Sequence, residues 1–375
     1  MGPYVHRGLR AVDPPVRELL RIGAYQVLYL DGVPPYAAVS ETVAQARHVA
    51  GARASGFVNA VLRRVVEGGA DPDRFPGFDE DPVGHLSTWG SHPRWLVERW
   101  LDRWSAEAVR RLVEANNTRP PVHLVPLEAT PSEAVERLRT VGIAAEEVGG
   151  GSRCVRLGAG AVVPEALTAA GPAIVQDPAA NFVSLFADVP TGTMVADLCA
   201  SPGGKFLALP AARLRIIAAD RSESRIHVMR ENARRVGRAI ACVVADALHP
   251  PLAESGAALL DVPCTGTGTL ARHPDARWRL RPEDVAKMAG LQSRMLDAAA
   301  EVVAPGGLLV YSTCSLEPEE NAEQISAFLG RRTDYVLAPT DAVPAEVRNE
   351  TGCLEVTPQE HGFDGSYAAR MRRVS

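Results

Sequence analysis

The spacing of apolar positions divides the chain into a helical front part and a later part with alternating strands and helices. Over residues 13–67, apolar side chains recur at helical spacing, and Asp13 before two prolines is typical of a helix start. We predict three helices there, the second over about 37–50 and the third over about 55–65. Residues 68–84 are rich in glycine, proline and aspartate, which predicts a linker.

Residues 85–190 mix helical and strand-like stretches and predict a small α+β subdomain. From residue 191 the pattern becomes regular. Strand-like runs occur at 194–199, 215–220, 240–246, 257–262 and 307–313, and helical segments at 203–212, 222–237, 283–304 and 317–330. Strands that alternate with helices predict an α/β fold with a doubly wound, Rossmann-like parallel sheet over 191–375.

Composition and charge limit the classes of protein to which the chain can belong. The 375 residues are 46% hydrophobic, so sizeable cores are expected, and no apolar run reaches the length of a membrane span. The six cysteines form no C-x-x-C pair, so we expect reduced thiols, no metal site and a cytoplasmic location. The net charge of −5 argues mildly against a nucleic-acid partner, although a local basic patch is compatible with it.

The strand ends carry a candidate cofactor site. The first strand of the regular part runs into D-L-C-A-S-P-G-G-K at 197–205, where paired glycines allow close approach of a ligand to a helix start. The next strands end at Asp220, Asp246 and Asp261, at the edge where such sheets bind ligands. An adenosyl ligand with a diol, an amine and a sulfonium explains these carboxylates. The segment 266–271 also matches a dinucleotide pattern, but it follows the fourth strand, so we discount it.

Two cysteines at strand ends suggest the chemistry. Cys264 follows Asp261-Val262-Pro263, and Cys314 follows the strand at 307–313. Two such thiols suit the methylation of cytosine at C5. This carbon is a poor nucleophile, and a thiolate that adds to C6 makes C5 electron-rich. A second cysteine is then available to assist release, and Asp261 to hydrogen-bond the base. These arguments leave open which cysteine attacks.

Three blocks carry a family resemblance. They are 197–205, the D-V-P-C-T-G-T-G run at 261–268 with R-H-P-D-A-R-W after it, and Y-S-T-C-S at 311–315 with E-E-N at 319–321. The chain resembles the RsmB/Sun (Fmu) family of 16S rRNA cytosine-C5 methyltransferases, within the NSUN family. The resemblance implies RNA as partner, Cys314 as nucleophile and Cys264 as the residue assisting release. It also implies that S-adenosylmethionine is bound by Cys199, Ala200, Ser201, Pro202, Gly203, Gly204, Lys205, Asp220, Arg225, Asp246 and Asp261.

The front helices resemble part of a NusB-like domain. We therefore expect a partial NusB-like RNA-binding domain at 1–67, a linker at 68–84, the α+β subdomain at 85–190 and the methyltransferase domain at 191–375. The first helices of the NusB-like domain are missing from the pattern, which suggests a truncated domain. Ser201, Phe206 and Ser366 depart from the family's usual residues.

Alternative functions remain at this point. One is a catalytically inactive RNA-binding protein of antitermination type, and another is methylation of tRNA instead of rRNA. An amino-group methyltransferase lacks support, because the fourth strand is followed by D-V-P-C. We also predict a basic RNA-binding patch of Arg272, Arg277 and Arg279. His273 and Trp278 would stack on bases there, although a core position for Trp278 is an equal alternative.

Overall fold

The front of the chain is a helical unit. The computed structural model describes residues 4–5, 8–69, 75–209 and 214–374, and its contacts divide the chain into compact units of residues 1–85 and 86–375. The front unit holds a 3-10 turn (Leu9–Ala11), α1 (Pro14–Tyr29) and α2 (Pro35–Gly68). Gly51 interrupts α2 with φ of 82°, so two helical segments meet there, as the sequence predicts.

The two long helices of the front unit pack through their apolar faces. Leu20 of α1 and Val58 and Leu62 of α2 are fully buried in the same cluster. Gly23 of α1 allows this close approach, because a Cβ there would lie 2.7 Å from Leu62 Cδ1. The amphipathic pattern of residues 13–67 therefore forms a small helical core.

The second unit begins with short helices and a small sheet. Helix α3 (Pro82–Thr88) spans the division between the units, and α4 (Arg94–Leu101) and α5 (Ala106–Asn117) follow. An antiparallel sheet in the order β2-β3-β1-β4 comes next. Its strands are β1 (His123–Pro126), β2 (Ala145–Glu147), β3 (Val155–Leu157) and β4 (Ala173–Val175), with α6 (Pro131–Thr140) and α7 (Val163–Ala170). This is the predicted α+β part.

The large sheet has the order β10-β12-β9-β8-β5-β6-β7, with β11 paired to β12. Strands β5 (Met194–Asp197), β6 (Arg215–Asp220), β7 (Ala241–Val244), β8 (Ser255–Asp261) and β9 (Val303–Thr313) run parallel, as predicted. Strands β10 (Tyr335–Leu337), β11 (Leu354–Val356) and β12 (Ser366–Arg373) extend it with antiparallel pairs. The predicted parallel, doubly wound sheet is confirmed, but these three antiparallel strands were not predicted.

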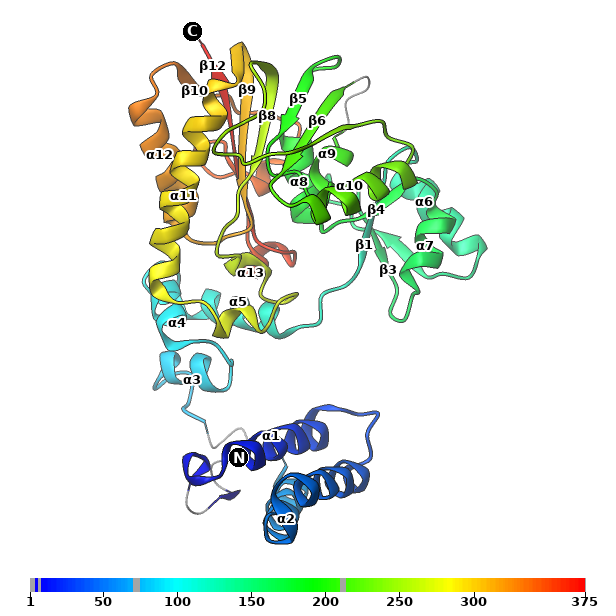
Figure 1. The fold of residues 1–375 in the computed structure, drawn as a ribbon, viewed down its shortest axis with the longest axis vertical. Helices are drawn as coiled ribbons and strands as arrows, with labels where there is room; N and C mark the ends of the chain where they lie inside the picture. Colours follow the sequence, from blue (N-terminus) through cyan, green and yellow to red (C-terminus); the bar gives the residue numbers. More distant parts are fainter. Residues whose placement is uncertain (1–3, 6–7, 70–74, 210–213, 375) are drawn as a thin grey trace. The chain divides into compact units, whose positions relative to one another are not determined.

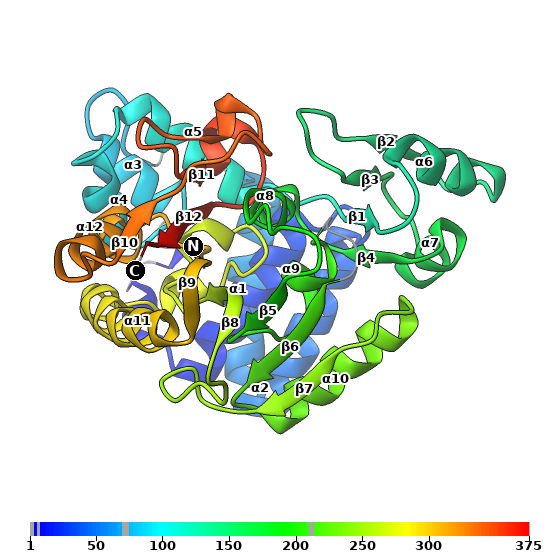
Figure 2. The same cartoon turned by 90° about the horizontal axis from the view of Figure 1, so that it is seen from above.

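Helices cover both faces of the large sheet (Figures 1 and 2). They are α8 (Pro178–Phe186), α9 (Gly204–Leu207), α10 (Glu223–Arg235), α11 (Pro282–Glu301) and α12 (Ala322–Arg331). The short α13 (Pro358–His361) packs against α5. The predicted helix at 203–212 ends at Leu207, and 210–213 lie outside the described residues. None of the described helices combines the length and the apolar character needed to cross a bilayer.

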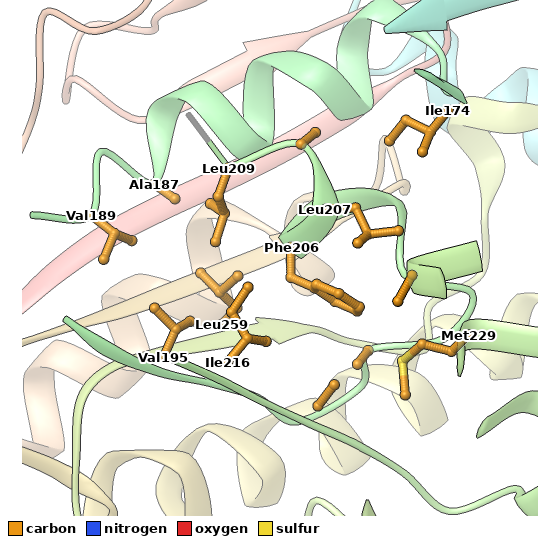
Figure 3. Packing of buried hydrophobic residues seen from close by; sticks show 14 of the residues in the cluster. Ile174, Ala187, Val189, Val195, Phe206, Leu207, Leu209, Ile216, Met229 and Leu259 are labelled. Carbon is orange, nitrogen blue, oxygen red and sulfur yellow. The ribbon is translucent and has the colours of Figure 1, made fainter. Parts of the chain in front are cut away.

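Alternation along the strands separates two cores. Val195 of β5 and Leu259 of β8 point to one face, where Phe206 and Met229 complete the cluster (Figure 3). The neighbouring residues on the same strands, such as Ala196 and Leu260, point to the other face and pack with α11 and α12. Burial of the strands on both faces explains their continuous apolar runs, and their carboxyl ends form the edge at which sheets of this kind bind ligands.

Candidate active site

The turn after β5 brings a helix start to the strand ends. Gly203 has φ of 106° in the left-handed region, and α9 begins at Gly204. A Cβ at Gly203 would lie 3.2 Å from the Phe206 ring, so glycine suits this position. The buried Asp197 side chain accepts a hydrogen bond from the Cys199 amide at 3.3 Å. Burial, reinforced by the negative charge of Asp261, raises the pKa of Asp197 to about 7.

A cavity of about 260 Å³ lies at the carboxyl ends of the parallel strands. Six predicted cofactor-binding residues line it, namely Cys199, Ser201, Asp220, Arg225, Asp246 and Asp261. The other five, Ala200, Pro202, Gly203, Gly204 and Lys205, belong to the same turn but do not line the cavity. Sequence reasoning missed the apolar wall of Leu248, Leu291 and Met295, because apolar residues on a loop and on α11 carry no local signal of a site.

Two of the lining carboxylates each accept hydrogen bonds through one oxygen from the described residues. Asp220 Oδ1 accepts from the Ser222 amide at 2.9 Å, and Asp246 Oδ1 accepts from the Leu248 amide at 2.9 Å. Within the described part of the chain, the second oxygen of each has no partner. The cavity therefore offers free hydrogen-bond acceptors to a ligand that carries hydroxyl or amino donors.

The two cysteines of the blocks at 261–268 and 311–315 lie side by side. Strands β8 and β9 are neighbours with Asp261 opposite Ser312, so the loops that follow them meet. Cys264 Sγ and Cys314 Sγ are 3.3 Å apart. Asp261 accepts from Lys205 Nζ at 2.6 Å and from Ser312 Oγ at 2.8 Å. A thiol pair and a lysine thus lie close to Asp261, whose carboxylate lines the cavity.

The surroundings of the two thiols differ in charge. The hydrogen bond from Cys264 lowers the pKa of Cys314, and the positive charge of Lys205 lowers it further against the opposing effects of burial and Asp261. The same hydrogen bond and burial raise the pKa of Cys264 well above that of an ordinary thiol, and the Glu320 carboxylate adds to this. The arrangement therefore favours the thiolate, which is the nucleophilic form, on Cys314.

A buried carboxylate holds both cysteine loops. Glu320 accepts from the Thr265 amide at 2.9 Å, from Gln292 Nε2 at 2.8 Å and from Ser315 Oγ at 2.5 Å. Asn321 Nδ2 donates to the Ser315 carbonyl at 2.8 Å. The E-E-N block therefore fixes the loop of Cys264 against that of Cys314. Gln292 of α11 was not expected here, because its partners are remote in sequence.

The glycines that resemble a dinucleotide pattern have a packing role. Gly268 N donates to the Cys314 carbonyl at 3.0 Å, and Gly365 N donates to the Gly268 carbonyl at 2.7 Å. A Cβ at Gly268 would lie 2.7 Å from Gly365 Cα and 2.8 Å from the Cys314 carbonyl oxygen. The close approach of three backbone segments accounts for this glycine.

The predicted basic patch is wrong for Arg277. Its side chain is 2% exposed and donates to Asn117 Oδ1 at 2.7 Å and to the carbonyls of Asn116 and Ser91, each at 3.0 Å. It fixes the loop after the Cys264 block to the end of α5. This role could not be predicted from the sequence, because its hydrogen-bond partners are far away in the chain. Trp278 next to it is 59% exposed, so the alternative of a core position for Trp278 is also wrong.

The other two arginines of the predicted patch are engaged by carboxylates. Arg272 is partly buried between Asp177 and Asp364. Arg279 is exposed and lies 2.9 Å from Asp275. Of the three, only Arg279 remains on the open surface.

The mixed sheet and its strand-end cavity define a class, the Rossmann-like methyltransferases. The family model described as 16S rRNA methyltransferase RsmB/F matches residues 186–372. The model of the NusB family matches 2–67, and that of the RsmF/B-like ferredoxin-like domain matches 92–164. The chain belongs to the RsmB/F family of 16S rRNA methyltransferases.

Individual relatives agree with this assignment. Ribosomal RNA small subunit methyltransferase B of Vibrio cholerae is 33% identical, over 95% of this chain and 80% of that protein. The protein of the same name from Photorhabdus laumondii is 32% identical, over 100% of this chain and 86% of that protein. The crystal structure of a methyltransferase homologue from Pyrococcus horikoshii is 28% identical with a TM-score of 0.66, over 78% of this chain and 99% of that one.

Proposed function

We propose that this protein methylates C5 of a cytosine in RNA, with 16S rRNA as the substrate and Cys314 as the nucleophile. The observation that carries the proposal is the pair of thiols 3.3 Å apart beside the strand-end cavity. Membership of the RsmB/F family supports the reaction class, and the names of the relatives support ribosomal RNA.

The cavity fits S-adenosylmethionine as the methyl donor. Its free acceptors, the second oxygens of Asp220 and Asp246, suit a ribose diol and an adenine amine, and Leu248 and Met295 offer an apolar surface to a ring. We assign the ribose to Asp220, which follows the glycine turn by one strand. When bound, S-adenosylmethionine supplies an electrophilic methyl group on a sulfonium.

The reaction then follows from the charges at the thiol pair. The Cys314 thiolate adds to C6 of the cytosine, and the electron pair displaced from the ring double bond makes C5 nucleophilic. Asp261 accepts a hydrogen bond from the amine or protonated N3 of the base. C5 takes the methyl group, and a base then accepts the C5 proton. The electron pair of the C5–H bond restores the ring double bond, and the pair of the sulfur–C6 bond returns to Cys314 as the thiolate. We assign assistance of this release to Cys264. The base must leave its stack to reach the thiols.

A denaturing gel of protein mixed with substrate RNA and cofactor tests the two roles. Cys264→Ala should still attack and transfer but should accumulate a covalent protein–RNA adduct. Cys314→Ala should form no adduct and no methylcytosine. Cys242→Ala, on β7 away from the thiol pair, is the matched control and should behave like the wild type. An adduct with Cys314→Ala and none with Cys264→Ala would reverse the roles.

Calorimetry tests the cofactor assignment. Asp220→Ala should weaken binding of S-adenosylmethionine by about 1–3 kcal/mol, because a ribose hydroxyl loses its acceptor. Asp341→Ala, at a side chain that is 94% exposed, is the control. Unchanged affinity of Asp220→Ala would remove Asp220 from the site.

Bisulfite sequencing of ribosomal and transfer RNA, with and without the gene, tests the substrate. A lost methylcytosine in 16S rRNA is the expected result. A loss confined to tRNA would replace the substrate, and no loss in either RNA would favour a protein that only binds RNA.

A further inference from the structure

A second cavity, of about 190 Å³, lies next to the thiol loops and has no part in the proposed reaction. Gly268, whose amide donates to the Cys314 carbonyl, forms part of its wall. His123 at the start of β1, Asp177 before α8, Arg272 after the cysteine block and Asp364 before β12 also line it. The cavity is thus built where four distant segments of the chain meet beside the nucleophile.

The polar groups of this cavity are not satisfied by one another. Arg272 Nε donates to Asp364 Oδ2 at 2.6 Å, and Arg272 Nη2 donates to Asp177 Oδ2 at 2.7 Å, so one guanidinium serves two carboxylates. Asp364 Oδ1 has no partner among the described residues. His123 is 3% exposed, its Nδ1 has no hydrogen-bond partner in that part of the chain, and Asp177 Oδ2 is 3.8 Å away, too far for a bond. Buried polar atoms normally have partners, so the unpaired His123 Nδ1 indicates a ligand, and the free oxygen of the partly buried Asp364 offers that ligand an acceptor.

The chemistry of the lining selects the ligand. Two carboxylates against one guanidinium disfavour a phosphate inside the cavity, whereas their oxygens accept from amino groups. Burial, with Asp177 close by, raises the pKa of Asp364 to about 6, and a donor that pairs with this carboxylate relieves that cost. The partly buried Phe363 contributes an aromatic ring to the lining, and the exposed Arg119 adds a positive charge to it.

We propose that this cavity is a subsite for one nucleobase with an amino group, from a nucleotide next to the target cytosine. Asp364 accepts from the amine, His123 pairs with a ring atom or exocyclic group, and Arg119 contacts the phosphate outside. Stacking on aromatic rings and hydrogen bonds to base edges are the usual means of reading unpaired RNA. The inference rests on the proposed function, because the subsite serves the RNA whose cytosine Cys314 attacks.

A panel of short RNAs tests the subsite. Each RNA carries the target cytosine with uridine substituted at one flanking position, and uracil lacks an amino group. For the wild type, uridine at one position should lower kcat/KM for methyl transfer by about tenfold. In Asp364→Asn, an amide donor replaces a carboxylate oxygen, and the penalty should fall below about threefold. Asp341→Asn, at an exposed aspartate, is the matched control and should keep the full penalty.

Two further variants distinguish the loss of the subsite from a general folding defect. His123→Ala should also reduce the uridine penalty, while Arg119→Ala should raise KM for every RNA and leave the penalty intact. Arg139→Ala, on the exposed side of α6, is the control for Arg119 and should leave KM unchanged. Binding of S-adenosylmethionine should stay within about twofold of the wild type in all variants, since none lines that cavity.

The outcomes separate the two proposals. A wild type that methylates every RNA of the panel equally, or a full penalty retained in both Asp364→Asn and His123→Ala, overturns the subsite while the proposed function stands. A wild type that methylates none of the RNAs overturns the proposed function, and the subsite falls with it.

Discussion

Gly268→Ala should disturb the thiol pair without changing any reacting group. The new Cβ would lie 2.7 Å from Gly365 Cα, 2.8 Å from the Cys314 carbonyl oxygen and 2.9 Å from the Gly365 carbonyl oxygen. All three obstacles are backbone atoms, so a side-chain rotation cannot relieve the overlap and the loops must part. Overpacking of this kind costs about 1–3 kcal/mol of folding free energy. At about 2–4 °C per kcal/mol for domains of 150–250 residues, the melting temperature should fall by several degrees.

The activity of Gly268→Ala should fall more steeply than its stability. The alanine pushes the loop of Cys264 away from that of Cys314, and a displacement of about 1 Å at reacting groups typically costs about 100-fold in rate. Thermal unfolding and methyl-transfer rates measure the two effects.

A glycine on α11 provides the control for this substitution. A Cβ at the exposed, helical Gly290 meets nothing within 4 Å, so Gly290→Ala should leave activity intact and stabilise the protein by about 0.5–1 kcal/mol. Gly268→Ala with wild-type melting temperature and wild-type activity would refute the reasoning about the close approach.

Three further substitutions test the charges around the site. Lys205→Met should raise the pKa of Cys314, so that the pH profile of Cys314 alkylation by iodoacetamide moves to higher pH; an unmoved profile would contradict the role of the lysine. Asp197, with its pKa raised to about 7 by burial, binds a proton more tightly in the folded than in the unfolded chain. Its ionisation therefore lowers the free energy of unfolding as pH rises from about 4 through 7. Asp197→Asn should flatten the dependence of this free energy on pH in that window, and chemical denaturation at several pH values measures it. Glu317→Gln should lower the free energy of unfolding by about 1–3 kcal/mol, because Arg99 loses the buried one of its two charged acceptors, Glu317 and Glu319; equal denaturation midpoints would exclude this.

Local sequence motifs predicted the strand ends that carry the candidate site. Contacts between segments that are far apart in the chain could not be predicted from the sequence. The parallel strands that carry Asp220 and Asp261 were found because a strand buried on both faces gives a continuous apolar run. The antiparallel β12 was missed because Arg370 is 7% exposed and donates to the carbonyls of Ala187 and Ala338, so a charged residue occupies a buried strand position. The buried position of Arg277 was not predicted for a similar reason, because the Ser91 carbonyl to which it donates is 186 residues away in the sequence.

Position alone does not distinguish the two thiols, because a separation of 3.3 Å is the same from either side. The charges around them are not symmetric. Lys205 favours a negative charge on Cys314 and Asp261 opposes it, while the buried carboxylate of Glu320 disfavours a negative charge on Cys264. With Cys264 as the donor, the hydrogen bond between the two sulfurs lowers the pKa of Cys314 and raises that of Cys264. In the proposed reaction, the Cys314 sulfur carries no negative charge once it is bonded to C6, and the effect that raised the pKa of Cys264 is weakened. The same contact that holds Cys264 protonated before attack therefore frees it to act in release afterwards, which gives each cysteine its proposed role at a different stage of one reaction.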